Sequence, residues 1–318
     1  MRGKVDHGAT SSFRRIALAI ALIAAPVANA DAAPRSGLIA FSRQIDGGGA
    51  NIFLARPDGS KARQVRLPHP AEDFGAPVFS PGSTRLLISH TLRFNSAGDL
   101  LPFRPLVVDV NGHHATLLDP PGAPFDMLCR AWSPDGRRLL CGFGGTKPGL
   151  FTIRATDGGH PVRLTTTPAD VQETPGDFSP DGHHVVLIRT SPGTEQTALF
   201  TVRTDGTQLK QLTPYGAEFG HEFADARWSP DGRDILFASP QGKLLLAHPD
   251  RPGLSTIDLA VPGPYFALAP AWSPDGTKIV FSMSVNGQED IYTANRDGSD
   301  VTQVTATPGF EPFADWGG

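Results

Sequence analysis

The stretch Ala271-Trp-Ser-Pro-Asp-Gly-Thr-Lys-Ile-Val-Phe281 decides the fold, because its first half recurs along the whole chain. Each copy starts with an aromatic residue, which Ser-Pro and a glycine-containing turn follow in all but the last, truncated copy. The aromatic residues of the six copies are Phe79, Trp132, Phe178, Trp228, Trp272 and Trp316. They are 53, 46, 50, 44 and 44 residues apart, and they include all four tryptophans. A period of this length indicates a repeat architecture.

A second recurring element is a short apolar strand that ends in a turn, as in Asp290-Ile-Tyr-Thr-Ala-Asn-Arg-Asp-Gly298. Proline presets the first central turn position, and glycine supplies the left-handed conformation that reverses the chain. Between the turns lie short, nearly continuous apolar runs such as Lys278-Ile-Val-Phe-Ser282. Such runs are typical of strands that are covered on both faces. Four antiparallel strands in about 45 residues predict the blade of a β-propeller.

The two ends of the repeat region complement each other. Residues 37–67 contain the later strands of a blade that has no aromatic first strand, whereas Phe313-Ala-Asp-Trp316 is a first strand with no blade after it. Joining them closes a ring and removes the open sheet edges. The sequence therefore predicts an all-β, six-bladed propeller with four antiparallel strands per blade, one blade being closed by the C-terminal strand.

These motifs resemble the WD40-like PD40 repeat of TolB-like propellers. The unit from Ala271 to Thr305 is the most similar, and the resemblance extends over residues 37–318. TolB itself carries an α/β domain before its propeller, and only about six residues precede the first predicted strand here after the N-terminal segment. The resemblance implies a propeller that lacks this domain and that uses one channel mouth to bind a partner peptide or a cation.

The N-terminal segment has the pattern of a secretory signal peptide. Basic residues precede the apolar run Ile16–Val27, and the small-residue cleavage site Ala28-Asn-Ala30 follows it. The run is too short to span a bilayer. We therefore expect a signal peptide at 1–30, a short linker at 31–36 and the propeller at 37–318. The mature protein would be periplasmic or secreted, with no membrane span.

Charge excludes one class of partner. The net charge is −4, and without residues 1–30 the chain has 24 basic and 31 acidic residues. Proteins that bind nucleic acid usually have a basic patch. We therefore expect no nucleic-acid partner. We also expect the protein to be a monomer.

Acidic residues recur five to seven positions before the repeat aromatics, where the chain leads into the innermost strand of each blade. These lead-in residues are Glu72, Asp73, Asp126, Glu173, His221, Glu222 and Glu311. Hard oxygen ligands suit Ca²⁺ or Mg²⁺. The pattern predicts a binding site at one channel mouth, with Asp73, Asp126, Glu173, Glu222 and Glu311 as metal ligands, Ca²⁺ being the cofactor considered. The alternative is an acidic, solvated rim without a ligand.

Three functional interpretations follow from this pattern. The first is a non-enzymatic scaffold that binds a periplasmic or envelope protein or peptide at the channel mouth. The second is an enzyme in that mouth, such as a metal-assisted polysaccharide lyase or hydrolase. A lyase would need several histidines beside the carboxylates, and His221 alone lies in the lead-in register. The third is a structural surface protein with neither metal nor partner.

Two further features leave alternatives open. The repeat aromatics could stack on sugars, but their common register favours packing between blades. The insertion Ser89–Pro105 is too apolar for a solvent-exposed connecting loop without a role. It is either a functional loop or a hairpin packed on its own blade.

The two cysteines predict a disulfide. Cys129 and Cys141 flank the turn Ser133-Pro-Asp-Gly136 and should lie nearly opposite each other in an antiparallel pair. A register error of one residue would place them on opposite faces. The alternative is two buried free thiols.

Overall fold

The computed structural model describes residues 37–44, 49–67, 73–92, 104–120, 127–143, 148–168, 170–194, 196–216 and 225–318. The chain divides into a unit of residues 1–35 and a unit of residues 36–318, and every described residue belongs to the second. The predicted signal peptide and linker therefore lie outside the described residues, as does most of the insertion. The described part of the chain contains no helix long and apolar enough to cross a bilayer.

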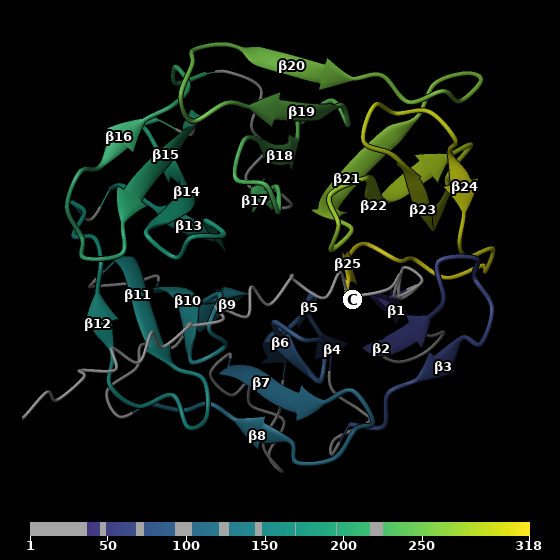
Figure 1. Cartoon of the computed structure of the whole chain (residues 1–318), viewed down its shortest axis with the longest axis horizontal. Coiled ribbons are helices and arrows are strands. Elements are labelled where there is room, and N and C mark those ends of the chain that lie inside the picture. Colours follow the sequence, from purple (N-terminus) through teal and green to yellow (C-terminus); the bar gives the residue numbers. More distant parts are fainter. Residues whose placement is uncertain are drawn as a thin grey trace, which may run out of the picture. The chain divides into compact units, whose positions relative to one another are not determined.

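Six antiparallel sheets surround a common centre, with the first strand of each sheet innermost (Figure 1). This arrangement confirms the predicted six-bladed propeller with four strands per blade. Blade 1 is β25 (Ala314–Trp316), β1 (Ile39–Gln44), β2 (Ala50–Ala55) and β3 (Arg63–Gln64). Blade 2 is β4 (Asp73–Phe74) with β5 (Pro77–Phe79), then β6 (Arg85–Leu92), β7 (Arg104–Asp109) and β8 (Thr116–Leu117). Blade 3 is β9 (Met127–Trp132), β10 (Arg138–Phe143), β11 (Gly149–Arg154) and β12 (Val162–Arg163).

The remaining three blades follow the chain in the same order. Blade 4 is β13 (Glu173–Phe178), β14 (His184–Thr190), β15 (Thr197–Arg203) and β16 (Lys210–Gln211). Blade 5 is β17 (Arg227–Trp228), β18 (Ile235–Ala238), β19 (Leu244–Ala247) and β20 (Leu254–Ile257). Blade 6 is β21 (Phe266–Trp272), β22 (Lys278–Val285), β23 (Gln288–Asn295) and β24 (Thr302–Gln303).

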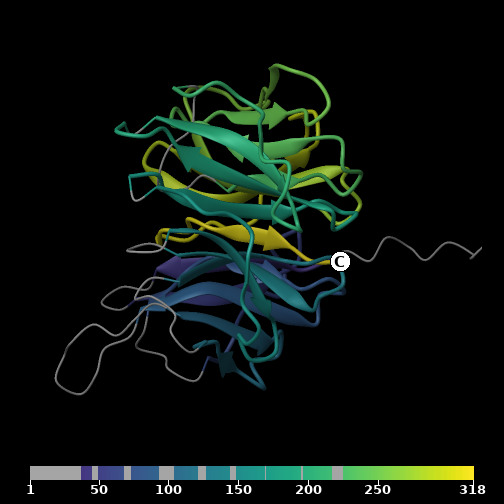
Figure 2. The same cartoon turned by 90° about the vertical axis from the view of Figure 1, so that its left-hand side faces the viewer.

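The C-terminal strand closes the ring as predicted. Strand β25 pairs antiparallel with β1, so that Ile39 is opposite Trp316 and Phe41 is opposite Ala314. The C-terminus lies near the centre of the ring in Figure 1 and at one edge in the side view of Figure 2. The first and last strands of the repeat region therefore share one blade, and β25 covers the inner edge of β1.

The repeated turn is held by its own side chains. In blade 6, Ser273 Oγ donates to Asp275 Oδ1 (2.6 Å) and accepts from the backbone N–H of Lys278 (2.9 Å). The Asp275 carboxylate in turn accepts from the backbone N–H of Thr277, and Gly276 has a φ of +68°. The same serine–aspartate pair is present in blades 3, 4 and 5. Serine, aspartate and glycine therefore recur because each one satisfies or shapes the same turn.

The hydrophobic core lies between blades. One cluster joins Val78 and Leu87 of blade 2 to Trp132 and Ile153 of blade 3, and five similar clusters join the other neighbouring pairs. Each sheet is thus covered on both faces, which explains the continuous apolar runs in the sequence.

A β-bulge sets the register between the cysteines. Trp132 is opposite Leu139 and Ala131 is opposite Leu140, but beyond the bulge Cys141 is opposite Cys129. Arg130 is the extra residue of the bulge. The two sulfur atoms are bonded in the structure, and the two Cα atoms are 4.0 Å apart. Without the bulge, Cys141 would face Arg130, so one inserted residue both aligns the cysteines and redirects an arginine.

Candidate functional site

A pocket of about 320 Å³ opens at the channel mouth where the Ser-Pro-Asp-Gly turns gather. We call it the turn-face pocket. Its wall contains turn prolines and repeat aromatics from several blades, and the charged side chains Asp177, Arg227 and Asp315 also line it. The innermost strands run from the lead-in residues to these turns. The turn-face pocket therefore lies at the opposite mouth of the channel from the lead-in residues, where the sequence had predicted a binding site.

The repeat aromatics that line the pocket are mainly packed between blades. Trp132 Nε1 donates to the carbonyl of Val78 in blade 2, and Trp272 Nε1 donates to the carbonyl of Arg227 in blade 5, both at 3.2 Å. Both side chains are buried. Trp228 is also buried, yet its Nε1 has no acceptor within the described part of the chain. The aromatics thus serve inter-blade packing and present only small areas to the pocket.

Two carboxylates at the pocket come from the position directly before a repeat aromatic. Asp315 Oδ2 accepts from the backbone N–H of Phe79 in the next blade (2.7 Å). Asp177 accepts from the backbone N–H of Phe178 (2.8 Å) and, in the next blade, of Trp228 (3.2 Å). Each carboxylate therefore links two neighbouring innermost strands and fixes where the channel charges lie.

Two arginines occupy the channel beside these acids. Arg227 is buried, and its Nη1 donates to the carbonyl of Arg130 (3.1 Å). Arg130 forms an ion pair with Asp225 (3.1 Å) and lies over the ring of Phe313. Of the five charged side chains in this described channel network, three are acidic and two are basic. The network therefore contains one more acidic side chain than basic ones.

Burial and charge perturb the titration of these groups. Burial raises the pKa of Asp177 from 3.8 to about 6, although Arg227 and two backbone N–H groups oppose the shift. Burial also raises the pKa of Asp315. Burial acts to lower the pKa of Arg227, but the carboxylates of Asp225, Asp315 and Asp177 raise it overall. Strongly perturbed acids that line a pocket are candidates for a binding role.

The two lead-in glutamates whose side chains are described have partners in the protein. Glu173 binds Arg189 (Oε1 to Nη2, 2.6 Å) and accepts from the hydroxyl of Thr165. Glu311 binds Arg43 (Oε1 to Nε, 2.5 Å) and accepts from the hydroxyls of Thr305 and Thr307. Both glutamate side chains are fully buried.

These glutamates repeat one local design rather than forming a common cluster. In each case the arginine lies over an aromatic ring, Arg189 over Phe200 and Arg43 over Phe53. The described residues contain no group of three or more His, Cys, Asp or Glu side chains able to hold a metal ion. The backbone of Asp73 lies in β4, and its side chain is not described. Glu72, Asp126, His221 and Glu222 lie outside the described residues, so the metal site stays a prediction.

The channel residues Arg130, Arg227 and Asp315 were missed by the sequence reasoning. A signal was present in the register: the residues directly before the six aromatics are Val78, Ala131, Asp177, Arg227, Ala271 and Asp315. Three of these positions are charged although they belong to short, buried strands. The bulge that carries Arg130 has no comparable signal.

Comparisons with known proteins support the fold. No family model matches the chain. An uncharacterized protein of Agrobacterium fabrum is 25% identical over 187 residues, which are 58% of this chain and 59% of that protein. The chain therefore matches less than two thirds of the length of this relative.

Solved structures give a broader match. TolB from Acinetobacter baumannii superposes with a TM-score of 0.65 and 16% identity, over 88% of this chain and 66% of that one. A TolB candidate from Agrobacterium tumefaciens gives 0.62 and 20% identity, over 89% of this chain and 98% of that one. A chain of the nidogen/laminin complex gives 0.61 and 11% identity, over 88% and 97%. At these identities the likeness concerns the fold, and it confirms that this chain has a TolB-like propeller.

Proposed function

We propose that this chain is an exported propeller that binds a protein or peptide partner at the turn-face pocket. The observation that carries the proposal is the combination, in one channel opening, of an apolar rim and a charged floor. Aromatic and proline side chains supply the rim, and Asp177, Arg227 and Asp315 supply the floor. Binding sites commonly combine an apolar lining with a few placed polar groups.

The charge at the floor suggests the chemistry of the partner. Both carboxylates are deprotonated less readily than usual, because burial raises their pKa values. An incoming cation would stabilise their charged forms. A lysine, an arginine or a chain N-terminus of the partner, flanked by apolar residues, fits this arrangement. The proposal assigns binding, not chemistry, to this pocket.

Export is part of the proposal and has two supports. Residues 1–30 have the pattern of a signal peptide. The Cys129–Cys141 disulfide is of a kind that persists in oxidising compartments. Fractionation followed by N-terminal sequencing tests it, and a cytoplasmic chain that retains residues 1–30 would contradict it.

The alternative of a metal-assisted lyase or hydrolase at a channel mouth is favoured by no specific observation. The described residues bring together no set of histidines and carboxylates suited to a metal. The lead-in glutamates that are described are already engaged by arginines.

Site-specific crosslinking tests the binding proposal. A photoreactive amino acid replaces Pro274, which lines the pocket, or Val162, which is exposed on the outer strand β12. We expect an adduct with an envelope protein from position 274 that is absent from position 162. The yield of the adduct should fall when Asp177→Lys is added, because the introduced lysine would repel the cationic group of the partner. Identical adducts from both positions, or an adduct unaffected by Asp177→Lys, would contradict the proposal.

A further inference from the structure

Three side chains of blade 5 form an Asp–His–Ser series: Asp234 directly precedes β18, His248 directly follows β19, and Ser255 lies on β20. Asp234 Oδ1 is 2.5 Å from His248 Nδ1, and His248 Nε2 is 3.2 Å from Ser255 Oγ. From this geometry we propose a second site, in which Ser255 is a nucleophile, His248 its general base and Asp234 the residue that orients the base. The substrate class is a small carboxylic ester.

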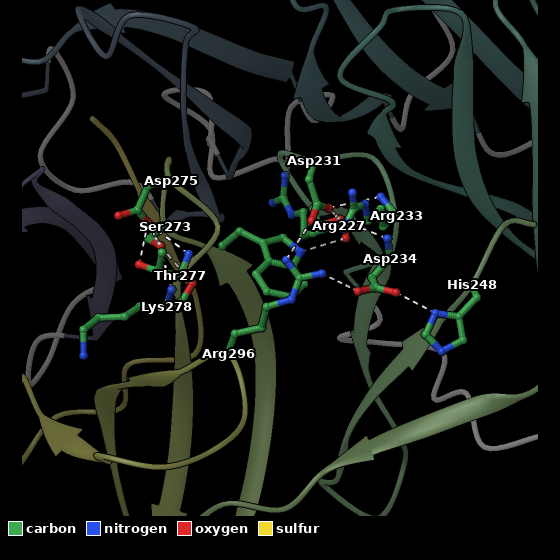
Figure 3. Close-up of polar contacts among 12 residues, drawn as sticks. Arg227, Asp231, Arg233, Asp234, His248, Ser273, Asp275, Thr277, Lys278 and Arg296 are labelled. Atoms are coloured by element: carbon green, nitrogen blue, oxygen red, sulfur yellow. Dashed lines mark hydrogen bonds and ion pairs between the residues drawn. The ribbon is translucent and has the colours of Figure 1, made fainter. Parts of the chain in front are cut away.

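The acid member is held rigidly. One carboxylate oxygen of Asp234 contacts His248, and the other accepts from Arg296 of blade 6 (Figure 3). The backbone N–H of Asp234 donates to Ser229 Oγ (3.0 Å). Arg296 is itself fixed, since it binds Asp231 (3.1 Å) and lies over the ring of Trp272. A carboxylate with both oxygens engaged can hold an imidazole in one orientation.

This contact fixes the tautomer of the neutral imidazole. An ionised carboxylate only accepts hydrogen bonds, so Nδ1 of His248 carries the proton. Nε2 then presents its lone pair, and two groups lie 3.2 Å from it, the hydroxyl of Ser255 and Nη2 of Arg251. The side chain of His248 is 10% exposed and is therefore shielded, whereas Ser255 is exposed on β20. A sheltered base next to an accessible hydroxyl is the arrangement that nucleophilic catalysis requires.

The surroundings can stabilise a developing negative charge. Arg251 Nη2 and Ser255 Oγ both lie 3.2 Å from His248 Nε2, so a guanidinium and the reacting hydroxyl adjoin the same atom of the base. Strand β20 is the outermost strand of its blade, and alternate backbone N–H groups of an edge strand have no strand partner. Such donors can act on an oxyanion.

A cavity beside the series offers room for a substrate. It has a volume of about 500 Å³, and Asp234, His248, Arg251 and Arg296 are among its lining residues. Ser255 is not part of this lining and adjoins the cavity through His248. All seven side chains that line it are charged or ionisable. We therefore expect a short, polar acyl group, since an aliphatic chain would find no apolar wall.

The reaction balances with water as the second reactant. Ser255 Oγ attacks the acyl carbonyl while its proton passes to His248 Nε2, and that proton then leaves with the alcohol. Water attacks the acyl-serine ester, gives one proton to Nε2 and releases the carboxylic acid, and Ser255 recovers its proton. One ester bond is broken, and the sum is ester plus water to acid plus alcohol.

Covalent labelling tests the proposal on the full chain. A fluorescent fluorophosphonate and p-nitrophenyl acetate are the probes, with Ser255→Ala and His248→Gln as variants. Thr256→Ala, a neighbouring exposed residue on β20, is the matched control. We expect an adduct that peptide mass spectrometry maps to Ser255 and that disappears in both variants but not in the control. Hydrolysis of the acetate should fall by about 100-fold in both variants.

Clear outcomes would overturn the proposal. They are an unlabelled wild-type chain, a label that persists in Ser255→Ala, or ester hydrolysis that is equal in all four proteins. Circular dichroism of each variant shows whether it is folded. Crosslinking from Pro274 should be unchanged in Ser255→Ala, which separates this site from the turn-face pocket.

Discussion

A single repeat position determines the character of the channel. The residue directly before the repeat aromatic is small or apolar in blades 2, 3 and 6, but it is charged at Asp177, Arg227 and Asp315. The aspartates cap backbone N–H groups of the next blade, and Arg227 lies among three carboxylates. A position that is apolar in three blades thus supplies charged side chains to the channel in the other three.

The raised pKa of Asp177 predicts a pH dependence of stability. Its pKa is about 6 in the folded protein against 3.8 ordinarily, so between these values the folded state holds the extra proton. The free energy of unfolding therefore falls as the pH rises from about 4 to 6. We expect the melting temperature of Asp177→Asn, relative to wild type, to increase over this window. The full effect is on the order of 3 kcal/mol.

Asp181 provides the matched control for this titration. The hydroxyl of Ser179 lowers its pKa, so its contribution to stability is present above the ordinary value and is lost only at lower pH. The difference between Asp181→Asn and wild type should be constant from pH 5 to 7.5. A constant difference for Asp177→Asn over pH 4–6 would show that Asp177 is not perturbed.

At the scale of the element, the turn and the bulge determine how a blade is built. The Ser-Pro-Asp-Gly turn satisfies its own backbone groups, and the bulge in β9 aligns the cysteines while it turns Arg130 toward Asp225. Turns of this kind can be predicted because each residue satisfies or shapes a group within the same turn. The bulge cannot be predicted in this way, because Arg130 binds Asp225, which is distant in the sequence.

The turn predicts a measurable cost for the loss of its serine. Ser273→Ala removes the acceptor for the Lys278 N–H and the donor to Asp275 in a buried position. We expect a loss of about 1–2 kcal/mol in the free energy of unfolding, measured by urea denaturation. Ser60→Ala, at an exposed turn, should change it by less than about 0.5 kcal/mol. Equal effects of the two substitutions would argue against the role of the buried hydroxyl.

The disulfide gives a second prediction at this scale. Cys129 and Cys141 close a short loop between β9 and β10, so replacing both by alanine should cost about 2–3 kcal/mol. Alkylation of the exported protein without reduction, followed by mass spectrometry, should add no alkyl group. Two alkylated thiols per chain would mean that the bond is absent from the protein in the cell.

The fold was predictable from the sequence because every blade repeats the same local signals. The split blade was predictable because Phe313–Trp316 matched the register of the other first strands. The site was less predictable. Glu173 and Glu311 are evenly spaced acids, but the pattern does not reveal that Arg189 and Arg43 bind them. The Asp234–His248–Ser255 series joins residues 7 and 14 positions apart across a turn, and no motif marks it.

For the whole molecule, closure depends on polar contacts more than the aromatic pattern implies. Trp316 is only partly buried, in contrast to the buried Trp132 and Trp272. The C-terminal segment instead contributes the pairing of β25 with β1 and the two buried acids Glu311 and Asp315. Glu311 binds Arg43 of blade 1, and Asp315 binds the backbone of Phe79 in blade 2.

Removal of residues 311–318 should therefore destabilise the entire propeller. Arg43 would lose the fully buried carboxylate of Glu311, and breaking a buried ion pair typically costs about 3–5 kcal/mol. Arg227 would lose one of its three neighbouring carboxylates. Strand β1 would also present an open inner edge. We expect a large fall in the melting temperature and its partial recovery when a synthetic peptide of residues 310–318 is added, because the peptide can pair with β1. A peptide with Glu311→Gln and Asp315→Asn should restore less, since it pairs but leaves Arg43 without Glu311 and Arg227 with two neighbouring carboxylates instead of three. An unchanged melting temperature in the truncated chain would show that the ring does not depend on this strand.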